Sequence, residues 1–319
     1  MYSPVRYFFL KNKLSLALSY FEKNLSICLK NKKKDSQYLA IAYYYIGSCS
    51  LRNSDYINVS KYVKLLIPLL NDFQKKQDNF DNIPAIYLLL GNFYLAGYID
   101  LKKAKYFYEL GLQASLKIYG PIHHSTATFY DNIGNIVLTQ SNFNIALTYF
   151  QKALSIRIKT LPNTHLHLVH SYGNIGNCYV YLNKTDKALL YYKKYITPII
   201  KKNYGEKDIF TYKTFNNISY ILLEKEAYQE AWEYLQILQK ADISEPKELK
   251  AGIYENIGRY FLGIKNASQA IHFFQKSIQI YLQVFVAKHK KLAHVYCCLA
   301  DSLILENKFP EALNYYSIA

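Results

Sequence analysis

The chain has 319 residues, and its hydrophobic share of 51% excludes an intrinsically disordered protein. The 12 glycines and 8 prolines are too few for an all-β fold with many tight turns. The formal net charge of +16 is compatible with nucleic acid, an anionic membrane or an acidic protein as a partner, but the lysines are scattered over linkers and predicted helix ends, which is typical of a solvated surface.

The cysteines and the hydropathy pattern favour a cytoplasmic protein. The five cysteines are odd in number and include no C-x-x-C pair, so a disulfide framework is not expected. No run of 18 apolar residues is present, and the short apolar run 7–10 is not followed by a signal-peptide cleavage pattern. We therefore predict a cytoplasmic location and no membrane partner.

The predicted elements are helices that come in pairs along the chain. Ala17 and Phe21 fit the second helix of a first pair, so Met1 falls inside that pair's first helix. From there on, a small residue recurs in the first helix of each pair at steps of 39 to 44 residues. In chain order these small residues are Gly47, Gly91, Gly134, Gly176, Ser219, Gly258 and Ala300.

A second small residue follows at a fixed distance in most pairs. Twelve residues after the first one, the last five pairs carry Ala146, Ala188, Ala231, Ala270 and Ala312, whereas Ala104 is displaced by one and Val59 takes the place in the earliest. Small residues on facing helices allow a close crossing. A large residue four positions after each alanine lies on the same helix face and is expected to fill the space between neighbouring hairpins, as at Phe150 and Phe274.

Turn residues separate the two helices of a pair, which predicts helical hairpins buried only by their neighbours. The turns are Ser141-Asn142, Asn183-Lys184, Lys265-Asn266 and Asn307-Lys308.

This pattern resembles the tetratricopeptide repeat, and the resemblance covers the whole chain. The stretch 132–154 has the family's spacing, with Gly134, Ala146, Phe150 and Ala153. The step of roughly 42 residues is similar to the long repeats of the kinesin light chain class. Residues supporting that likeness are Tyr119-Gly120-Pro121-Ile122-His123, Asn132-Ile133-Gly134, Ala153-Leu154-Ser155-Ile156-Arg157, His165, Asn174-Ile175-Gly176 and Ala188.

The resemblance implies an all-α fold, a right-handed superhelical solenoid of antiparallel helix hairpins with about seven to eight repeats. We expect a single solenoid over 1–319, with repeats near 1–34, 35–78, 79–121, 122–163, 164–206, 207–245, 246–287 and 288–319. Because neither end has a polar capping helix, we also expect the array to continue beyond one or both ends, as the repeat region of a larger sensor or effector such as a TPR-CHAT protein. The alternative is that the open edges stack against a partner or another copy.

The histidines first suggest a metal site, because His165, His167 and His170 are closely spaced. However, His123, His165 and His289 each lie 11 residues before their pair's small residue, and Asp208 takes this place in another linker. A position that recurs between repeats indicates linker packing or a helix cap. No nucleophile, phosphate-loop or dinucleotide motif is present. We therefore predict no metal, no cofactor and no catalytic residue, and a protein that is not an enzyme.

Asparagines recur beside the small positions of the first helices, although asparagine is a poor helix former. They are Asn132, Asn174, Asn217 and Asn256, two residues before the small residue, and Asn92, Asn135 and Asn177, one residue after it. A row of amides on the concave face is suited to the backbone of an extended peptide, and it is equally suited to a hydrogen-bond ladder between repeats. Lys213 and Arg259 are expected to add anion contacts on the same surface.

These features predict a non-catalytic scaffold or regulatory module that binds a peptide or protein segment in its concave groove. The partner is another protein or another domain of the same longer chain. Nucleic acid bound through the basic surface is one alternative, and it requires lysines along one face with interleaved aromatics. An intracellular receptor for a peptide pheromone is the other.

Overall fold

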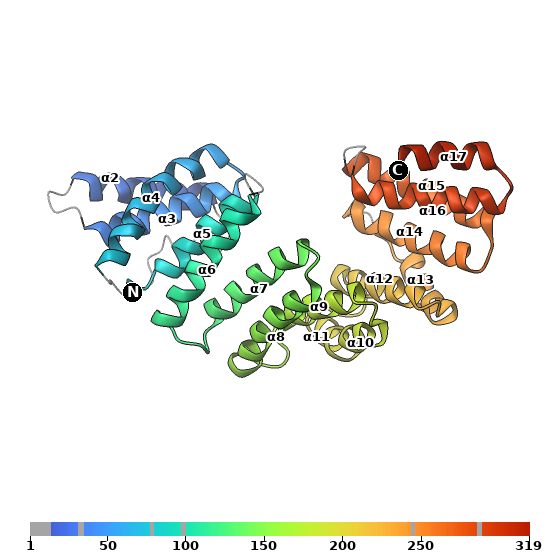
Figure 1. Cartoon of the computed structure of the whole chain (residues 1–319), viewed down its shortest axis with the longest axis horizontal. Coiled ribbons are helices and arrows are strands. Elements are labelled where there is room, and N and C mark those ends of the chain that lie inside the picture. Colours follow the sequence, from blue (N-terminus) through green and yellow to red (C-terminus); the bar gives the residue numbers. More distant parts are fainter. Residues whose placement is uncertain (1–13, 31–34, 77–79, 97–99, 244–245, 286–288) are drawn as a thin grey trace. The chain divides into compact units, whose positions relative to one another are not determined.

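The computed structural model describes residues 14–30, 35–76, 80–96, 100–243, 246–285 and 289–319 (Figure 1). Over these residues the chain is built from helices and short turns and contains no strand, which confirms the all-α prediction. The apolar run 7–10 and the first helix expected within 1–34 lie outside the described residues. None of the described helices combines the length and the apolar character needed to cross a bilayer.

The chain divides into two compact units, 1–161 and 162–319, called here the N-terminal and the C-terminal unit. The helices of the N-terminal unit are α2 (Leu14–Lys30), α3 (Ser36–Arg52), α4 (Tyr56–Lys75), α5 (Ile83–Ala96), α6 (Leu101–Ile118), α7 (His124–Thr139) and α8 (Phe143–Thr160). The expectation of one solenoid over 1–319, with the repeat bounds given above, stays a prediction.

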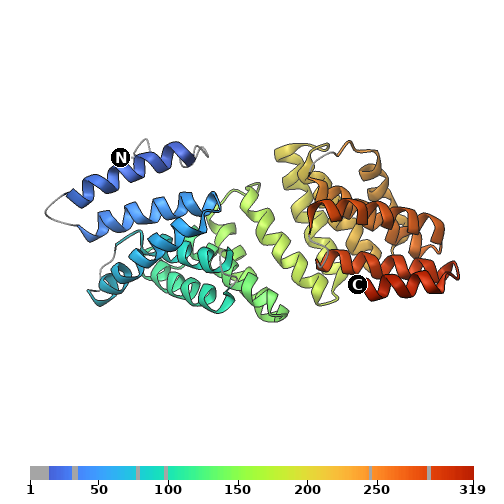
Figure 2. The same cartoon turned by 90° about the horizontal axis from the view of Figure 1, so that it is seen from above.

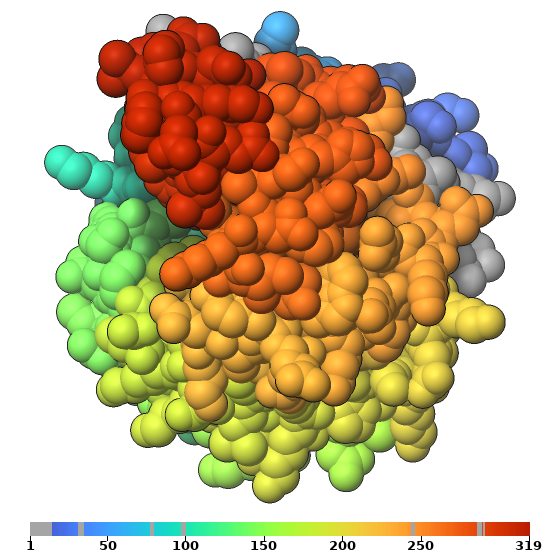
Figure 3. Space-filling view, turned by 90° about the vertical axis from the view of Figure 1, so that its right-hand side faces the viewer, coloured from blue at the N-terminus to red at the C-terminus, as the bar shows by residue number. Residues whose placement is uncertain are grey.

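The helices of the C-terminal unit are α9 (Leu166–Tyr181), α10 (Thr185–Leu190), the π-helical turn η1 (Tyr191–Ile196), α11 (Thr197–Tyr204), α12 (Ile209–Glu224), α13 (Tyr228–Lys240), α14 (Lys247–Gly263), α15 (Ala267–Val284), α16 (Lys290–Leu305) and α17 (Phe309–Ile318). Figure 3 shows the later hairpins of this unit layered in chain order, from yellow to red.

Within each unit, successive helices pair into antiparallel hairpins, as α14 with α15 and α16 with α17 in Figure 2. The hairpin turns share one feature, a single residue with φ between 54° and 62° at Ser54, Ser141, Asn183, Glu226, Lys265 and Asn307. The four turns predicted from the sequence are among them. A positive φ reverses the chain within two residues, so the second helix begins at once and folds back on the first.

The recurrent small residues allow the two helices of a hairpin to cross closely. A Cβ atom on Gly134 would lie 2.7 Å from the Phe150 ring, and one on Gly258 would lie 2.7 Å from the Phe274 ring. Both rings are fully buried. The rings therefore fill the crossing inside their own hairpin, which corrects the expectation that they fill the space between hairpins.

An aromatic pair recurs in each hairpin from α3–α4 to α16–α17, and these pairs include 11 of the 34 tyrosines. A ring four residues before the small residue meets a ring on the second helix, with centroids 5.3 to 6.5 Å apart. The pairs are Tyr43–Tyr62, Tyr87–Phe107, Tyr130–Tyr149, Tyr172–Tyr191, Phe215–Tyr234, Tyr254–Phe273 and Tyr296–Tyr315. Such pairs stabilise by about 0.5–1.5 kcal/mol beyond the area that they bury.

The linker histidines are helix caps, as predicted. The Nδ1 atoms of His123, His165 and His289 accept from the backbone N–H two residues on, at 3.2, 3.1 and 3.3 Å. Asp208 caps α12 in the same way, accepting from Phe210 at 2.9 Å. Within the described residues, no group of three or more His, Cys, Asp or Glu side chains is arranged to hold a metal ion.

One second helix departs from the regular hairpin. Between α10 and α11 the turn η1 is π-helical, and Thr197 Oγ1 donates to the Tyr192 carbonyl at 2.8 Å. Pro198 follows directly and has no N–H to continue the i→i−4 ladder, which explains the wider turn. The periodicity of the sequence predicted one regular helix here.

Candidate ligand-binding groove of the C-terminal unit

A groove of about 940 Å³ runs across the first helices of four consecutive hairpins, α9, α12, α14 and α16. Helices α9 and α12 contribute Asn177, Val180, Tyr181, Lys213, Asn216, Asn217, Tyr220 and Ile221. The remaining lining residues are Tyr192, Pro246, Glu248, Leu249, Gly252, Glu255, Asn256, Tyr281, Lys291 and His294. All of them belong to the C-terminal unit.

Most of the lining residues occupy equivalent positions of their hairpins. Lys213, Gly252 and His294 lie six residues before the small residue, and Asn216 and Glu255 lie three before it. A spacing of three to four residues places side chains on one face of an α-helix. The inner faces of neighbouring first helices are thereby aligned into rows across the groove.

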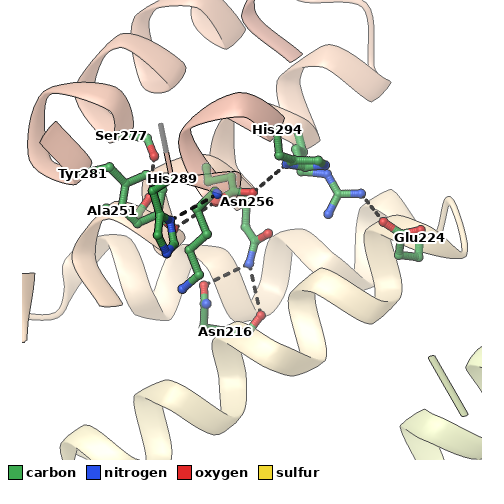
Figure 4. Close-up of polar contacts among 11 residues, drawn as sticks. Asn216, Glu224, Ala251, Asn256, Ser277, Tyr281, His289 and His294 are labelled. Atoms are coloured by element: carbon green, nitrogen blue, oxygen red, sulfur yellow. Dashed lines mark hydrogen bonds and ion pairs between the residues drawn. The ribbon is translucent and has the colours of Figure 1, made fainter. Parts of the chain in front are cut away.

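Asn256 bridges two hairpins at the base of the groove. Its Nδ2 donates to the Asn216 carbonyl at 3.1 Å and to Asn216 Oδ1 at 2.9 Å (Figure 4). Asn256 is 3% exposed, so its amide depends on these protein acceptors. Asn256 is thus a contact between α14 and α12, as the ladder interpretation of the asparagines required at this position.

Two other asparagines bond inside their own hairpin. Asn92 Oδ1 accepts from the Tyr108 hydroxyl and Asn177 Oδ1 accepts from the Tyr192 hydroxyl, each at 2.7 Å. Burial raises the pKa of Tyr192 to about 12, and a hydrogen bond with Asn217 opposes this rise. These amides hold a tyrosine of the second helix against the first helix.

Glu255 joins three helices within the groove. Its Oε2 accepts from the Tyr281 hydroxyl on α15 at 3.0 Å, and its Oε1 lies 3.0 Å from His294 Nδ1 on α16. The Glu255 side chain is only 15% exposed. Burial, together with the charge of Glu255, raises the pKa of Tyr281 well above its usual value, so this hydroxyl remains a donor.

The remaining charges differ in their partners. Lys291 forms an ion pair with Glu248 across α16 and α14. Lys213 lies over the Phe210 ring at 5.3 Å, and no carboxylate pairs with it among the described residues. Lys213 is thus the lining cation with uncompensated charge.

The structure brings together four of the nine residues predicted as ligand contacts. These four groove residues are Asn177, Asn217, Asn256 and Lys213. Arg259 does not line the groove, because it pairs with Glu224 and covers the Tyr220 ring at 4.8 Å. Its Nη1 atom is buried without an acceptor among the described residues.

The other predicted asparagines lie elsewhere. Asn174 is on α9 but does not line the groove, and Asn92, Asn132 and Asn135 belong to the N-terminal unit. Within the described residues Asn135 is exposed and has no hydrogen-bond partner, which distinguishes it from Asn92. A role of these residues in ligand binding stays a prediction.

Sequence reasoning missed several lining residues because they differ in type. Asn216, Gly252, Glu255, Tyr281 and His294 share no residue type that a repeat search would select. What most of them share is position, three or six residues before the small residue. A search of those two positions in every repeat, regardless of residue type, would have found all of these residues except Tyr281.

The comparisons with known proteins agree with this geometry. A tetratricopeptide repeat model matches residues 125–197. The search of curated proteins found no significant match. Among solved structures, the apo form of the quorum sensor NprR from B. thuringiensis is 16% identical with a TM-score of 0.74, covering 98% of this chain and 84% of that one.

Two further solved structures are similar in fold. The apo form of RapI is 18% identical with a TM-score of 0.67, covering 88% of this chain and 95% of that one. A Podospora anserina putative kinesin light chain with nearly identical TPR-like repeats is 14% identical with a TM-score of 0.53, covering 64% and 98%. At these identities the likeness concerns the fold. Together with the repeat match over 125–197 and the hairpins, it shows that this chain has a tetratricopeptide-like helical-repeat fold.

Proposed function

We propose that this protein is a non-catalytic interaction module whose C-terminal groove binds an extended segment of a partner polypeptide. The observation that carries the proposal is the row of amide, hydroxyl and aromatic groups across four first helices. An extended polypeptide presents alternating N–H and C=O groups, and amide side chains can bond both kinds.

The groove is suited to a peptide in size and in chemistry. Its volume of about 940 Å³ is near the upper end of ordinary ligand pockets. Tyr181 and Tyr220 add rings that can pack on apolar side chains and still hydrogen-bond through their hydroxyls. The fold likeness to a protein described as a quorum sensor keeps an intracellular peptide-pheromone receptor as one form of this proposal.

The ion pairs of the C-terminal unit favour a polypeptide over nucleic acid. Part of the basic charge is offset by carboxylates in the pairs Lys193–Glu230, Lys201–Glu206, Lys225–Asp186, Lys291–Glu248 and Lys308–Glu306. A nucleic-acid surface depends on unpaired cations that neutralise phosphates, and its affinity falls steeply with salt. We place that alternative second.

The proposal is tested by selecting a displayed random heptapeptide library on the intact chain. Gly252→Leu adds an apolar side chain to the groove, and Gln236→Leu adds the same side chain to the exposed face of α13. We expect selected peptides to lose at least about tenfold in affinity, about 1.4 kcal/mol, with Gly252→Leu but not with Gln236→Leu. Peptides that bind both variants like the parent, or a chain that selects none and binds single-stranded DNA below 50 mM salt, would overturn it.

A further inference from the structure

Gly252 leaves a hollow in the groove that packing does not require. A Cβ atom here would lie 3.5 Å from Asn216 Nδ2 and 3.5 Å from Tyr281 Oη, which is ordinary contact distance. By contrast, a Cβ atom on Gly258, in the same helix, would lie 2.7 Å from the Phe274 ring. The backbone of Gly252 is helical as well, so no left-handed φ demands glycine.

The two polar atoms beside the hollow offer opposite hydrogen-bonding roles. Asn216 Oδ1 accepts from Asn256, and the Nδ2 atom of Asn216 has no acceptor among the described residues. The Tyr281 hydroxyl donates its single hydrogen to Glu255 Oε2, so the lone pairs of Tyr281 Oη remain available to accept a hydrogen bond. One side therefore donates and the other accepts.

The charges around the hollow disfavour an ionised ligand group. Lys213 and His294 hold the equivalent positions on the neighbouring first helices α12 and α16. Glu255 lies one turn along α14. A carboxylate in the hollow would lie within one helical turn of Glu255, whose charge opposes the attraction of Lys213, and an ammonium group would share the groove with Lys213 and Lys291. A neutral polar group meets neither repulsion.

We propose that the hollow at Gly252 receives one uncharged polar side chain of the bound segment, a carboxamide or a hydroxyl. The oxygen of that side chain accepts from Asn216 Nδ2, and its N–H or O–H donates to Tyr281 Oη. This inference rests on the proposed function, since it names what the same groove selects. Gly252 is then a specificity position, because any side chain there fills the hollow.

The test uses the heptapeptides selected on the intact chain, with Gly252→Ala as the variant. Alanine adds one methyl group at ordinary contact distance and favours the helix, so the fold is retained. Gly173→Ala is the matched control, because a Cβ there meets only Ile196, at 4.0 Å, and does not line the groove. Fluorescence anisotropy measures the affinity of each selected peptide and of copies that carry Leu, Asp or Lys at its shared polar position. Copies with Asn and with Ser at that position show whether a carboxamide or a hydroxyl is preferred.

We expect one aligned position to be Asn, Gln, Ser or Thr, and its replacement to weaken binding at least about tenfold. In Gly252→Ala the same replacement should weaken binding by about threefold or less, whereas in Gly173→Ala the loss of affinity is unchanged. If the peptides lose affinity for Gly252→Leu but share no such position, this inference is overturned and the groove proposal stands. The same holds if Gly252→Ala preserves the loss of affinity caused by replacing that position. Peptides indifferent to Gly252→Leu overturn both.

Discussion

The two units use the same hairpin but differ in the side chains on the inner faces of their first helices. At the positions six and three residues before the small residue, α3 and α5 carry Ile41, Tyr44, Ala85 and Leu88, whereas α12 and α14 carry Lys213, Asn216, Gly252 and Glu255. Ile41 and Tyr44 pack against an apolar cluster that also holds Ile86 and Leu66. These positions on α3 and α5 are thus apolar, and those on α12 and α14 line a polar groove.

Hairpin formation and the chemistry of the inner face thus depend on largely separate positions, with the exception of Tyr192, which covers Gly176 and also lines the groove. The small residue, the ring that covers it and the recurrent aromatic pair make the hairpin in both units. The inner face remains available for apolar or polar residues without changing that geometry. Neighbouring C-terminal hairpins are joined by polar contacts such as Asn256 to Asn216, so a ligand that takes one of these partners acts on the junction itself.

Loss of apolar packing in the N-terminal unit should lower stability more than any substitution considered below. Ile86 is fully buried in its apolar cluster, so Ile86→Ala should lower the free energy of unfolding by about 2–5 kcal/mol. Urea unfolding followed by far-UV circular dichroism measures the change. A loss under about 1 kcal/mol would contradict the view that apolar contacts hold these hairpins together.

Two glycine substitutions separate a packing position from a groove position. Gly134→Ala forces a methyl group toward the Phe150 ring and should destabilise by about 1–3 kcal/mol. Gly252→Ala meets no close atom and should stabilise by up to about 1 kcal/mol. Circular dichroism follows the first variant, and the fluorescence of Trp232, the chain's single tryptophan, follows the second. Destabilisation by Gly252→Ala would mean that the hollow is a packing requirement after all.

Two asparagine substitutions test which amides are structural. Asn256→Ala removes the donor to Asn216 and should cost about 1–3 kcal/mol of unfolding free energy, since two partly buried hydrogen bonds are lost. Asn135→Ala removes an exposed amide without a bond and should change stability by less than about 0.5 kcal/mol. Equal costs, measured by urea unfolding, would show that the two positions act alike.

The hairpins, turns and caps were predictable from the sequence because each depends on residues close together in the chain. His123 caps the helix that starts one residue later, and Ser141 makes a turn between two helices that follow directly. The role of an asparagine is less local. Asn177 is structural because Tyr192, 15 residues later, donates a hydrogen bond to it. The residue 15 positions after Asn135 is Phe150, which has no hydroxyl to donate.

The groove itself was only partly predictable. Its floor depends on how α12, α14 and α16 stack, which brings together an amide, a glycine, a carboxylate and an imidazole of no common type. Tyr281 was assigned no role from its position, since it lies near the end of a second helix. The Tyr281 hydroxyl reaches the groove and donates a hydrogen bond to Glu255 on the neighbouring first helix.

The helix caps of the two units should respond differently to acid, although the change in stability is small. Burial, with the charge of His124 adding, lowers the pKa of His123 below its usual value. The Nδ1 atom must stay unprotonated to accept from Ser125. As pH falls, the unfolded chain therefore takes up a proton before the folded one, so the stability from this cap is present above pH near 6.5 and lost below it.

His123→Asp replaces this cap by a carboxylate, the group that already caps α12 as Asp208. We expect wild type to lose about 1 kcal/mol or less from this cap between pH 7.5 and 5.0, and His123→Asp to lose less than wild type. The reciprocal change, Asp208→His, should introduce the same acid sensitivity into the C-terminal unit, where Trp232 fluorescence in urea reports it. If both variants keep the wild-type pH dependence, the caps do not titrate, and acid lability must be sought in other groups.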